Sequence, residues 1–270
     1  MTIIEKTNKL EKWAIIFGGT GSFGLATAKQ LVKDNFNLVL VYRERKNSLS
    51  QLEEELLFLR NCTKIIEYNL NANLTENKET IIKSLIEEYN LKDKISFVLH
   101  AIADGNLNPM FNTETQNSLK YEDFLHTIET MGLSLYDWTK RLFENGLLSK
   151  KTSIVGLTSE GTHRFLQDYA AVASAKAVME SNIKYIAVEM CKYGIRANLI
   201  NAGITDTKAL RAFPKYAEFI DKAKQRNPYG RLTTAEDVAK VIAFLAKEES
   251  EWINGTVITV DGGEQLISFY

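Results

Sequence analysis

One glycine-rich stretch decides the fold, Phe17-Gly18-Gly19-Thr20-Gly21-Ser22-Phe23-Gly24. It follows an apolar run of strand length, Trp13–Phe17, and it opens a segment with helical spacing, Gly24–Lys33. Glycine permits a tight turn and a close approach of the backbone, and the N–H groups at the start of a helix bind phosphate. The stretch therefore predicts a turn that holds the pyrophosphate of a dinucleotide, with contacts at Gly18, Ser22, Phe23 and Gly24.

Apolar runs of strand length alternate with segments of helical spacing along the chain, and no linker interrupts them. This alternation is typical of βαβ units that form a parallel sheet. We therefore predict an α/β fold in a single domain over residues 1–270, a Rossmann-like doubly wound sheet of seven parallel strands. The predicted strands are Trp13–Phe17, Asn37–Tyr42, Lys64–Tyr68, Ile95–His100, Ser153–Leu157, Arg196–Ile200 and Val257–Val260. The predicted helices are Gly24–Lys33, Ser48–Asn61, Thr75–Tyr89, Tyr121–Asn145, Tyr169–Tyr193 and Ala235–Lys247.

The segment from Thr205 to Arg231 fits neither the strand period nor the helix period, and it contains Pro214 and Pro228. We predict an excursion of short helices over residues 205–231. In folds of this kind ligands bind beyond the carboxyl ends of the strands, and an insert at that edge covers them. The excursion is therefore predicted to cover the substrate.

The chain of 270 residues carries 33 basic and 34 acidic residues, so no strong field favours nucleic acid or an anionic membrane. Only two cysteines occur, Cys62 and Cys191, and their contexts suggest neither a disulfide nor a metal site. The segment Met1–Lys12 lacks the continuous apolar core of a secretory signal or a membrane span. We therefore predict a cytoplasmic protein that acts on small molecules, with no metal, no nucleic acid and no membrane partner.

The second predicted strand ends in a basic run, Tyr42-Arg43-Glu44-Arg45-Lys46, where enzymes that prefer NADH carry an acidic residue. Arg43 could stack on adenine and, with Arg45 or Lys46, pair with a 2′-phosphate. The run therefore predicts NADPH as the cofactor in preference to NADH. A solvated surface face is the alternative, because Glu44 lies in its middle.

The third predicted strand is followed by Asn69-Leu70. The Asn69 amide could hydrogen-bond the edge of an adenine, which makes both residues cofactor candidates. A strand-end turn without a ligand is the equally weighted alternative.

Tyr169 and Lys176 lie seven residues apart in an alanine-rich segment of helical spacing. At 3.6 residues per turn this separation returns to nearly the same helix face, so the phenol and the ammonium would project together. Such a pair could deliver a proton beside a bound cofactor. An ordinary amphipathic tyrosine and a surface lysine are the alternative.

Several segments occur in a characteristic order after the glycine turn. Ser159 closes the fifth predicted strand, Tyr169 follows ten residues later, and Asn201–Thr207 and Val260–Gly263 come after the last two strands. Together they resemble the short-chain dehydrogenase/reductase family over essentially the whole chain. Ordinary members place the tyrosine four residues before the lysine, and Val172 occupies that position here. The resemblance therefore disfavours an ordinary carbonyl reductase.

A tyrosine seven residues before the lysine resembles the divergent branch of that family, the bacterial enoyl-acyl-carrier-protein reductases. Ordinary members use an asparagine of the fifth helix in a proton relay, and Glu129–Ser134 contains none, so any relay here must use other groups. His100–Ala103 also resembles the divergent branch. Further segments resemble the NADPH-dependent enzymes of the bacillus type, namely Thr158–Gly161, Ile204–Pro214 and Pro228–Arg231.

This resemblance implies a reaction and a set of roles. Hydride from reduced nicotinamide would reach the β-carbon of a trans-2-enoyl thioester, and Tyr169 would hydrogen-bond the enolate oxygen that develops. Lys176 would bind the nicotinamide ribose and make the phenol more acidic. Ser159 would orient the carbonyl or the tyrosine, or else only cap the following turn. The Ile204 backbone would bind the carboxamide, and Thr207 the pyrophosphate.

The resemblance also implies partners. The acyl substrate would be bound to an acyl carrier protein or to coenzyme A in fatty-acid or related synthesis, and the long helices Tyr121–Asn145 and Tyr169–Tyr193 would form a homodimer or homotetramer. The alternative function is reduction of a carbonyl, on a 3-oxoacyl or polyketide substrate of a secondary pathway. A nucleotide-binding member without catalytic activity is a third possibility, which the presence of both Tyr169 and Lys176 disfavours.

Overall fold

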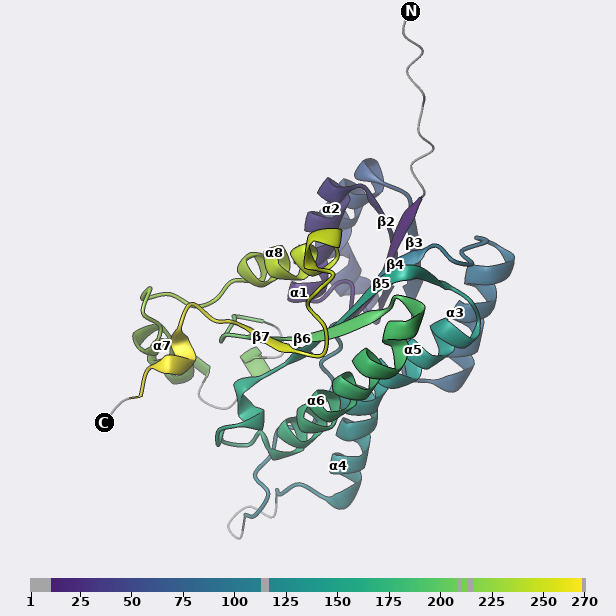
Figure 1. Ribbon diagram of the computed structural model, residues 1–270. Coiled ribbons are helices and arrows are strands. Elements are labelled where there is room, and N and C mark those ends of the chain that lie inside the picture. Colours follow the sequence, from purple (N-terminus) through teal and green to yellow (C-terminus); the bar gives the residue numbers. More distant parts are fainter. Residues whose placement is uncertain (1–10, 113–116, 208–209, 213–215, 269–270) are drawn as a thin grey trace, which may run out of the picture.

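The computed structural model describes residues 11–112, 117–207, 210–212 and 216–268. Seven strands form one sheet in the order β3-β2-β1-β4-β5-β6-β7, and every neighbouring pair is parallel (Figure 1). The chain builds one half of the sheet outward from β1 to β3, crosses back, and builds the other half from β4 to β7. The predicted Rossmann-like doubly wound sheet is confirmed. The strands are β1 (Lys12–Phe17), β2 (Phe36–Tyr42), β3 (Ile65–Asn69), β4 (Ile95–His100), β5 (Leu148–Thr158), β6 (Arg196–Ala202) and β7 (Val257–Val260).

Helices cover both faces of this sheet (Figure 1). Apolar side chains of α1, α2 and α8 pack with Leu38 and Leu40 on one face, and those of α3, α5 and α6 belong to the cluster of Val39 and Val41 on the other. Neighbouring β2 residues thus serve opposite layers, as the two-residue period of a strand requires. The helices are α1 (Ser22–Leu31), α2 (Lys46–Cys62), α3 (Thr75–Glu87), α4 (Tyr121–Thr127), α5 (Ser134–Glu144), α6 (Ala170–Met190), α7 (Tyr216–Arg226) and α8 (Ala235–Leu245).

The helix predicted over Tyr121–Asn145 is not one continuous α-helix. A π-helical stretch, Ile128–Leu133, separates α4 from α5. Gly132 lies in this stretch, and a Cβ on it would stand 2.7 Å from the Ala175 carbonyl oxygen of α6. The missing side chain therefore lets the two helix backbones approach closely.

The described parts of the predicted excursion contain short helices. They are the 3₁₀ turn Leu210–Ala212 and α7, which contacts a second 3₁₀ turn near the C-terminus, Glu264–Leu266. Residues 208–209 and 213–215 of the excursion lie outside the described residues. The excursion is thus held by contacts with a segment that follows the last strand.

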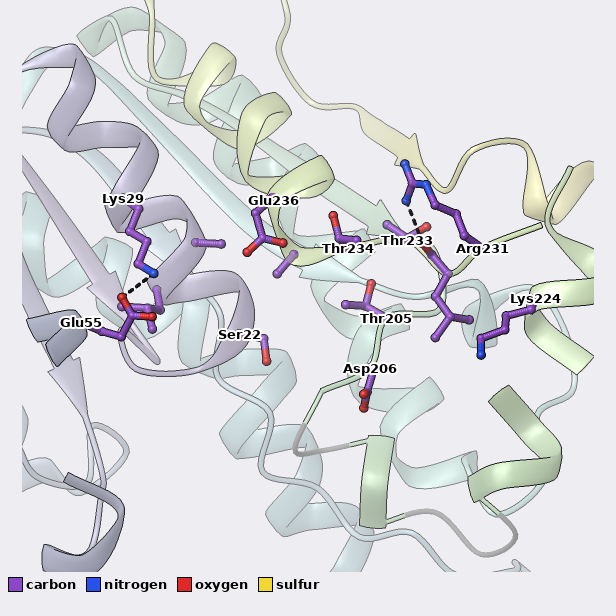
Figure 2. A pocket seen from close by; sticks show the side chains of 14 residues that line it. Ser22, Lys29, Glu55, Thr205, Asp206, Lys224, Arg231, Thr233, Thr234 and Glu236 are labelled. Carbon is purple, nitrogen blue, oxygen red and sulfur yellow. Dashed lines mark hydrogen bonds and ion pairs between the residues drawn. The ribbon is translucent and has the colours of Figure 1, made fainter. Parts of the chain in front are cut away.

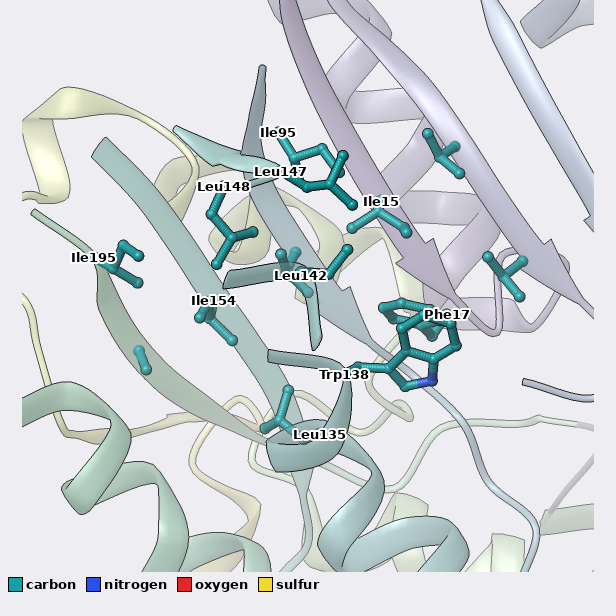
Figure 3. Close-up of a cluster of buried hydrophobic side chains, with 14 of the residues drawn as sticks. Ile15, Phe17, Ile95, Leu135, Trp138, Leu142, Leu147, Leu148, Ile154 and Ile195 are labelled. Atoms are coloured by element: carbon teal, nitrogen blue, oxygen red, sulfur yellow. The ribbon is translucent and has the colours of Figure 1, made fainter. Parts of the chain in front are cut away.

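A pair of stacked aromatic rings anchors α5 under the carboxyl end of β1 (Figure 3). Phe17 and Trp138 have ring centroids 4.3 Å apart, and both side chains are fully buried. The Trp138 indole N–H donates to the Ala72 carbonyl oxygen at 3.0 Å. Phe17 directly precedes the glycine turn, so this contact holds in place the strand end from which the turn begins.

The glycine turn is packed so closely that two of its glycines have no room for a side chain. Gly18 has φ +84°, and a Cβ on it would lie 2.6 Å from the Ala101 carbonyl oxygen after β4. A Cβ on Gly24 would lie 2.2 Å from the Gly18 carbonyl oxygen. At Gly21, where φ is −67°, the closest atom would be 3.2 Å away. Gly18 and Gly24 are therefore demanded by backbone contacts, and Gly21 is less constrained.

We expect Gly24→Ala to lower the free energy of unfolding by about 1–3 kcal/mol, because its methyl group must displace the Gly18 backbone. Gly21→Ala is the matched control in the same turn, and we expect a clearly smaller loss. Urea unfolding of the two variants beside the parent protein measures both values. Equal losses would contradict the tight contact between Gly18 and Gly24.

Candidate active site

A pocket of about 350 Å³ lies at the carboxyl ends of β5 and β6 and is also lined by residues that follow β4. In a doubly wound sheet this edge is where ligands bind. The pocket brings together residues that are far apart in the sequence. Those predicted as site residues that line it are Phe23, Ser159, Tyr169, Ile204 and Thr207.

The spacing from Lys176 suggested that Tyr169 lies inside a helix. Instead, Tyr169 is the N-cap residue of α6 and directly precedes its first helical residue. Its carbonyl oxygen accepts the first helical hydrogen bond, from the Ala173 N–H at 2.8 Å. Its ring lies against Gly161, where an added Cβ would stand 2.5 Å from the ring carbons. The turn after β5, and not the helix alone, therefore sets the position of the phenol.

The Ser159 hydroxyl makes two contacts, one with Tyr169 and one with the turn that follows it. It hydrogen-bonds the Tyr169 side chain, and it accepts the Gly161 N–H at 3.1 Å as the cap of the turn Glu160–Thr162. Burial raises the pKa of Tyr169, the Ser159 hydrogen bond opposes this shift, and the charge of Glu160 adds to it. The net shift in the pKa of Tyr169 is upward, contrary to the more acidic phenol that the resemblance implied.

Lys176 lies in the second turn of α6 and is buried, with only 6% of its surface exposed. Its ammonium donates to the Leu157 carbonyl oxygen at 2.7 Å, near the end of β5. Burial lowers the pKa of Lys176 to about 8. An ammonium has three N–H donors, so two remain that could bind the hydroxyls of a ribose.

A buried polar chain lies next to Lys176, and sequence reasoning did not assign it. His100 of β4 pairs with Gly156 of β5, one residue before the carbonyl that binds Lys176. The His100 Nε2 lies 3.0 Å from the Ser134 hydroxyl, which donates to the Asn73 side-chain oxygen at 2.9 Å. Burial and the charge of Lys176 lower the pKa of His100 to about 3, so the ring is neutral. Ser134, the last residue of the stretch Glu129–Ser134 that contains no asparagine, thus contacts His100, whose ring is affected by the charge of Lys176.

The start of α1 has the features of a phosphate site. Its N-cap residue is Gly21, which has no side chain to occupy the first N–H groups of the helix. A second pocket of about 570 Å³ reaches this end, lined by Ser22 and by Thr205, which also lines the first pocket. Figure 2 shows the Lys29–Glu55 ion pair on one side of it and the side chains of Lys224 and Arg231 on the other. The glycine turn therefore fits a bound pyrophosphate, as predicted for it.

The residues predicted to bind the adenine end of the cofactor make contacts with other residues of the protein. The exposed Arg43 guanidinium pairs with Asp104 at 3.1 Å. The Asn69 amide accepts the Glu44 N–H at 2.9 Å and donates to the Glu44 carbonyl at 3.0 Å, and the Leu70 N–H donates to the end of β2. Asn69 and Leu70 thus hold the strand ends together. Their contact with a cofactor remains a prediction.

Ile204 and Thr207 also have partners. The Ile204 N–H donates to the Glu264 carboxylate at 3.1 Å, and the Thr207 hydroxyl accepts the Leu210 N–H at 3.1 Å. A carboxamide that used the Ile204 N–H would have to displace Glu264. This carboxylate could not be predicted from local patterns, because it lies 60 residues further along the chain.

Among the described residues, no helix is long and apolar enough to cross a membrane. Within the residues that the structure describes, no three or more His, Cys, Asp or Glu side chains are grouped so that they could hold a metal ion.

Two relatives of known description match nearly the whole chain. The NADH-dependent enoyl-acyl-carrier-protein reductase of Buchnera aphidicola is 28% identical over 260 residues, 94% of each chain. The chloroplastic NADPH-dependent aldehyde reductase-like protein of Arabidopsis thaliana is 27% identical over 259 residues, 93% of each chain.

Solved structures share the fold. The NADH-dependent enoyl-acyl-carrier-protein reductase of Aquifex aeolicus has a TM-score of 0.81 at 24% identity, over 97% of this chain and 99% of that chain. The actinorhodin polyketide ketoreductase, in a structure with NADPH, has a TM-score of 0.80 at 20% identity, over 94% and 97% of the two chains. At these identities the likeness shows the fold alone.

The family model described as enoyl-(acyl carrier protein) reductase matches residues 18–265, from the glycine turn to the last 3₁₀ turn. The match thus contains the residues that line both pockets, and it contains Ser159, Tyr169 and Lys176. The chain therefore belongs to the enoyl-(acyl carrier protein) reductase family within the short-chain dehydrogenase/reductases, and it is an oxidoreductase.

Proposed function

We propose that the protein reduces the 2,3 double bond of an enoyl thioester carried by an acyl carrier protein or by coenzyme A. The observation that carries this proposal is the position of the phenol. Tyr169 is the one tyrosine among the described residues that line the active-site pocket, and Val172 stands where ordinary carbonyl reductases place theirs. The donor is therefore displaced along α6, away from the place where a ketone oxygen would be bound.

This displacement suits an enoyl thioester. In a ketone the oxygen is bonded to the carbon that accepts hydride, whereas in an enoyl thioester it lies two carbons further on. Three residues of helix correspond to roughly 4–5 Å along the axis. Tyr169 would therefore reach the thioester oxygen while the β-carbon faces the hydride donor.

Reduced nicotinamide, bound along the carboxyl edge of the sheet, would supply the hydride. As the β-carbon accepts it, the carbon–carbon double bond opens and negative charge moves to the thioester oxygen. Tyr169 would stabilise that charge by donating its O–H to the thioester oxygen, and Ser159 hydrogen-bonds the phenol. The α-carbon then takes a proton, which comes finally from water, and the saturated thioester leaves.

The rest of the pocket suits an acyl chain. Its apolar wall comes from the loop after β4, the π-helical stretch, the segment between β5 and α6, α6 itself and the excursion. The residues of this wall are Leu107, Met131, Leu166, Val172, Leu210 and Phe219. Leu210 and Phe219 belong to residues 205–231, which supports the substrate-covering role predicted for them.

We further propose NADPH as the preferred cofactor. Three cationic side chains, Arg43, Arg45 and Lys46, lie at the end of β2 and the start of α2. The Arg43 pair with Asp104 is exposed and weak, so a phosphate could replace the carboxylate. The Glu44 carboxylate accepts the Thr20 hydroxyl of the glycine turn at 3.1 Å, which is the feature that would oppose a 2′-phosphate.

Self-association through α4, α5 and α6 is also part of the proposal. These helices expose large apolar side chains, which a solvated helix face does not need. They are Tyr121, Leu125, Tyr136, Tyr185 and Val188. A homodimer or homotetramer would cover them.

Reduction of a carbonyl remains the second candidate. It is favoured by the NADPH-dependent aldehyde reductase-like relative. The buried Val172, only 4% exposed, opposes it because no phenol can take that position.

Turnover with paired substrates tests the proposed reaction. We expect crotonyl-coenzyme A to oxidise NADPH at least about tenfold faster than acetoacetyl-coenzyme A, because only in the crotonyl substrate does the charge develop on the thioester oxygen that the displaced phenol reaches. Absorbance of the reduced nicotinamide measures both rates, with the acyl-carrier-protein forms of the same chains as a second pair. Faster turnover of the acetoacetyl substrates would overturn the enoyl assignment.

Removal of the phenolic hydroxyl tests the role of Tyr169. We expect Tyr169→Phe to lower kcat by about 100-fold and to leave cofactor binding nearly unchanged, because one donor to the developing charge is lost. Tyr89→Phe is the control, since that phenol is exposed at the end of α3. A Tyr169→Phe enzyme with the parent kcat would assign the proton chemistry to another group.

Two neighbouring substitutions test the cofactor. We expect Arg43→Ala to raise KM for NADPH by about tenfold and to leave KM for NADH nearly constant, because only NADPH carries the charged 2′-phosphate. Glu44→Gln should change KM for NADPH in the opposite direction, since it removes a negative charge beside that phosphate. An enzyme that prefers NADH and is indifferent to both substitutions would refute NADPH as the cofactor.

A further inference from the structure

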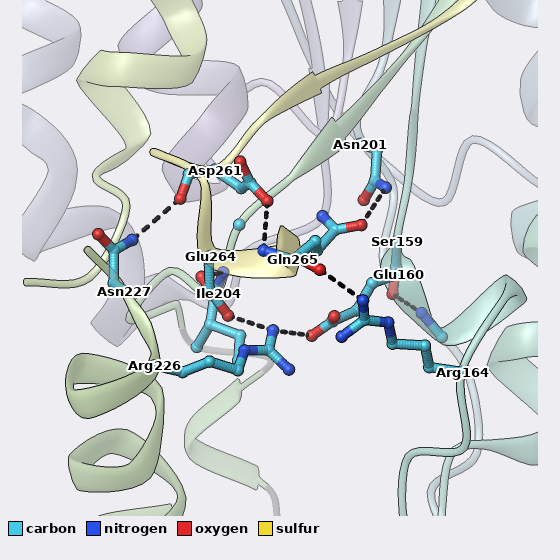
Figure 4. A network of polar contacts seen from close by, with 12 residues as sticks. Ser159, Glu160, Arg164, Asn201, Ile204, Arg226, Asn227, Asp261, Glu264 and Gln265 are labelled. Carbon is cyan, nitrogen blue, oxygen red and sulfur yellow. Dashed lines mark hydrogen bonds and ion pairs between the residues drawn. The ribbon is translucent and has the colours of Figure 1, made fainter. Parts of the chain in front are cut away.

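Arg226, near the C-terminal end of α7, joins two carboxylates from segments far apart in the sequence (Figure 4). Its guanidinium contacts Glu160 and lies 2.5 Å from Glu264. Glu160 follows Ser159 in the turn after β5, and Glu264 begins the 3₁₀ turn after β7. One cation thus connects the excursion, the catalytic turn and the C-terminal segment.

The three groups are shielded from water. The exposed fractions of the side chains are 18% for Arg226, 7% for Glu160 and 1% for Glu264. Buried carboxylates are costly unless a cation or strong hydrogen bonds compensate their charge. Glu264 has a second partner in the Ile204 N–H, whereas one Glu160 oxygen has none among the described residues. Glu160 therefore depends on Arg226 more than Glu264 does.

Other charged groups nearby are engaged elsewhere. His163 lies 3.3 Å from Glu180, which accepts hydrogen bonds from Thr158 and Thr162. The Arg164 guanidinium donates to the Gln265 carbonyl oxygen. Asp261 accepts backbone N–H groups of its own turn, and the Lys176 ammonium is bound to Leu157. Arg226 is therefore the cation that compensates Glu160.

Glu160 lies where its charge matters for the reaction. It lines the active-site pocket together with Ser159 and Tyr169. Its charge raises the pKa of Tyr169, in addition to the larger effect of burial. An uncompensated Glu160 would therefore oppose negative charge on a substrate oxygen held by that phenol.

We infer that Arg226 is a positioning residue that neutralises Glu160 beside Tyr169 and fastens α7 over the acyl pocket. The inference rests on the proposed role of Tyr169 as hydrogen-bond donor to the substrate. It gives the excursion an electrostatic part in the reaction as well as a covering one. When α7 is in place, Arg226 completes the charge balance around the phenol.

Arg226→Gln is the direct test. We expect kcat to fall by about 10–100-fold and the basic limb of its pH profile to move up by about one pH unit, because an unpaired Glu160 stabilises the neutral phenol. The double variant Arg226→Gln, Glu160→Gln should recover most of kcat and return the limb to its parent position. The substrate is whichever of the enoyl and keto thioesters the enzyme turns over. The matched control is Arg60→Gln, since Arg60 also pairs with two glutamates, Glu53 and Glu67, on the outer part of α2 and β3.

A readout without turnover keeps the test separate from the proposed reaction. Ring-labelled tyrosine NMR, assigned with Tyr169→Phe, should show the phenol titrating at lower pH in Glu160→Gln than in the parent, and this variant keeps Arg226 and the fold. Arg226→Gln that keeps the parent pH profile, or loses kcat without recovery by Glu160→Gln, would show that the bridge is only structural. If Arg226→Gln does not fold, an unchanged Tyr169 titration in Glu160→Gln overturns the inference alone.

Discussion

The backbone contact at Gly18 is the constraint on which the site depends. The Gly18 carbonyl lies so close to Gly24 that Gly24 has no room for a Cβ atom. The Ala101 carbonyl after β4 lies so close to Gly18 that Gly18 has none either. These contacts bring the start of α1 to the carboxyl ends of β1 and β4. Since β5 and β6 continue the same parallel sheet, their ends lie at the same edge, and their turns supply the remaining groups of the pocket.

A second layer of organisation is electrostatic. Lys176 is buried beside a neutral His100, and its pKa of about 8 reflects the loss of hydration. Glu160, which lines the pocket with Tyr169, is paired with Arg226 of a distant helix. Burial and the Glu160 charge raise the pKa of the Tyr169 phenol, and the Ser159 hydrogen bond lowers it. Burial alone would leave the phenol a poorer donor.

Local sequence patterns were sufficient to predict the sheet and the types of residue that make up the site. Apolar runs and glycine spacing act within a few residues, so all seven strands and the glycine turn could be predicted, and Ser159 and Tyr169 do meet in one pocket. The π-helical stretch could not be predicted, because it depends on Gly132 meeting Ala175 of another helix. Arg226 and its carboxylates lie 66 and 38 residues apart in the chain, and each alone has the pattern of a surface charge.

The N-cap position of Tyr169 links the phenol to the turn after β5. Inside a helix, a tyrosine four residues before the lysine would have its position set by helical hydrogen bonds alone. Here the backbone turns at Tyr169, and its ring is placed by Gly161 and Ser159 of the turn after β5. Because Glu160 of that same turn is paired with Arg226 of α7, the turn that places the phenol is also connected to a helix that borders the pocket. The position of the phenol therefore depends on the turn Ser159–Gly161 as much as on the spacing of Tyr169 and Lys176.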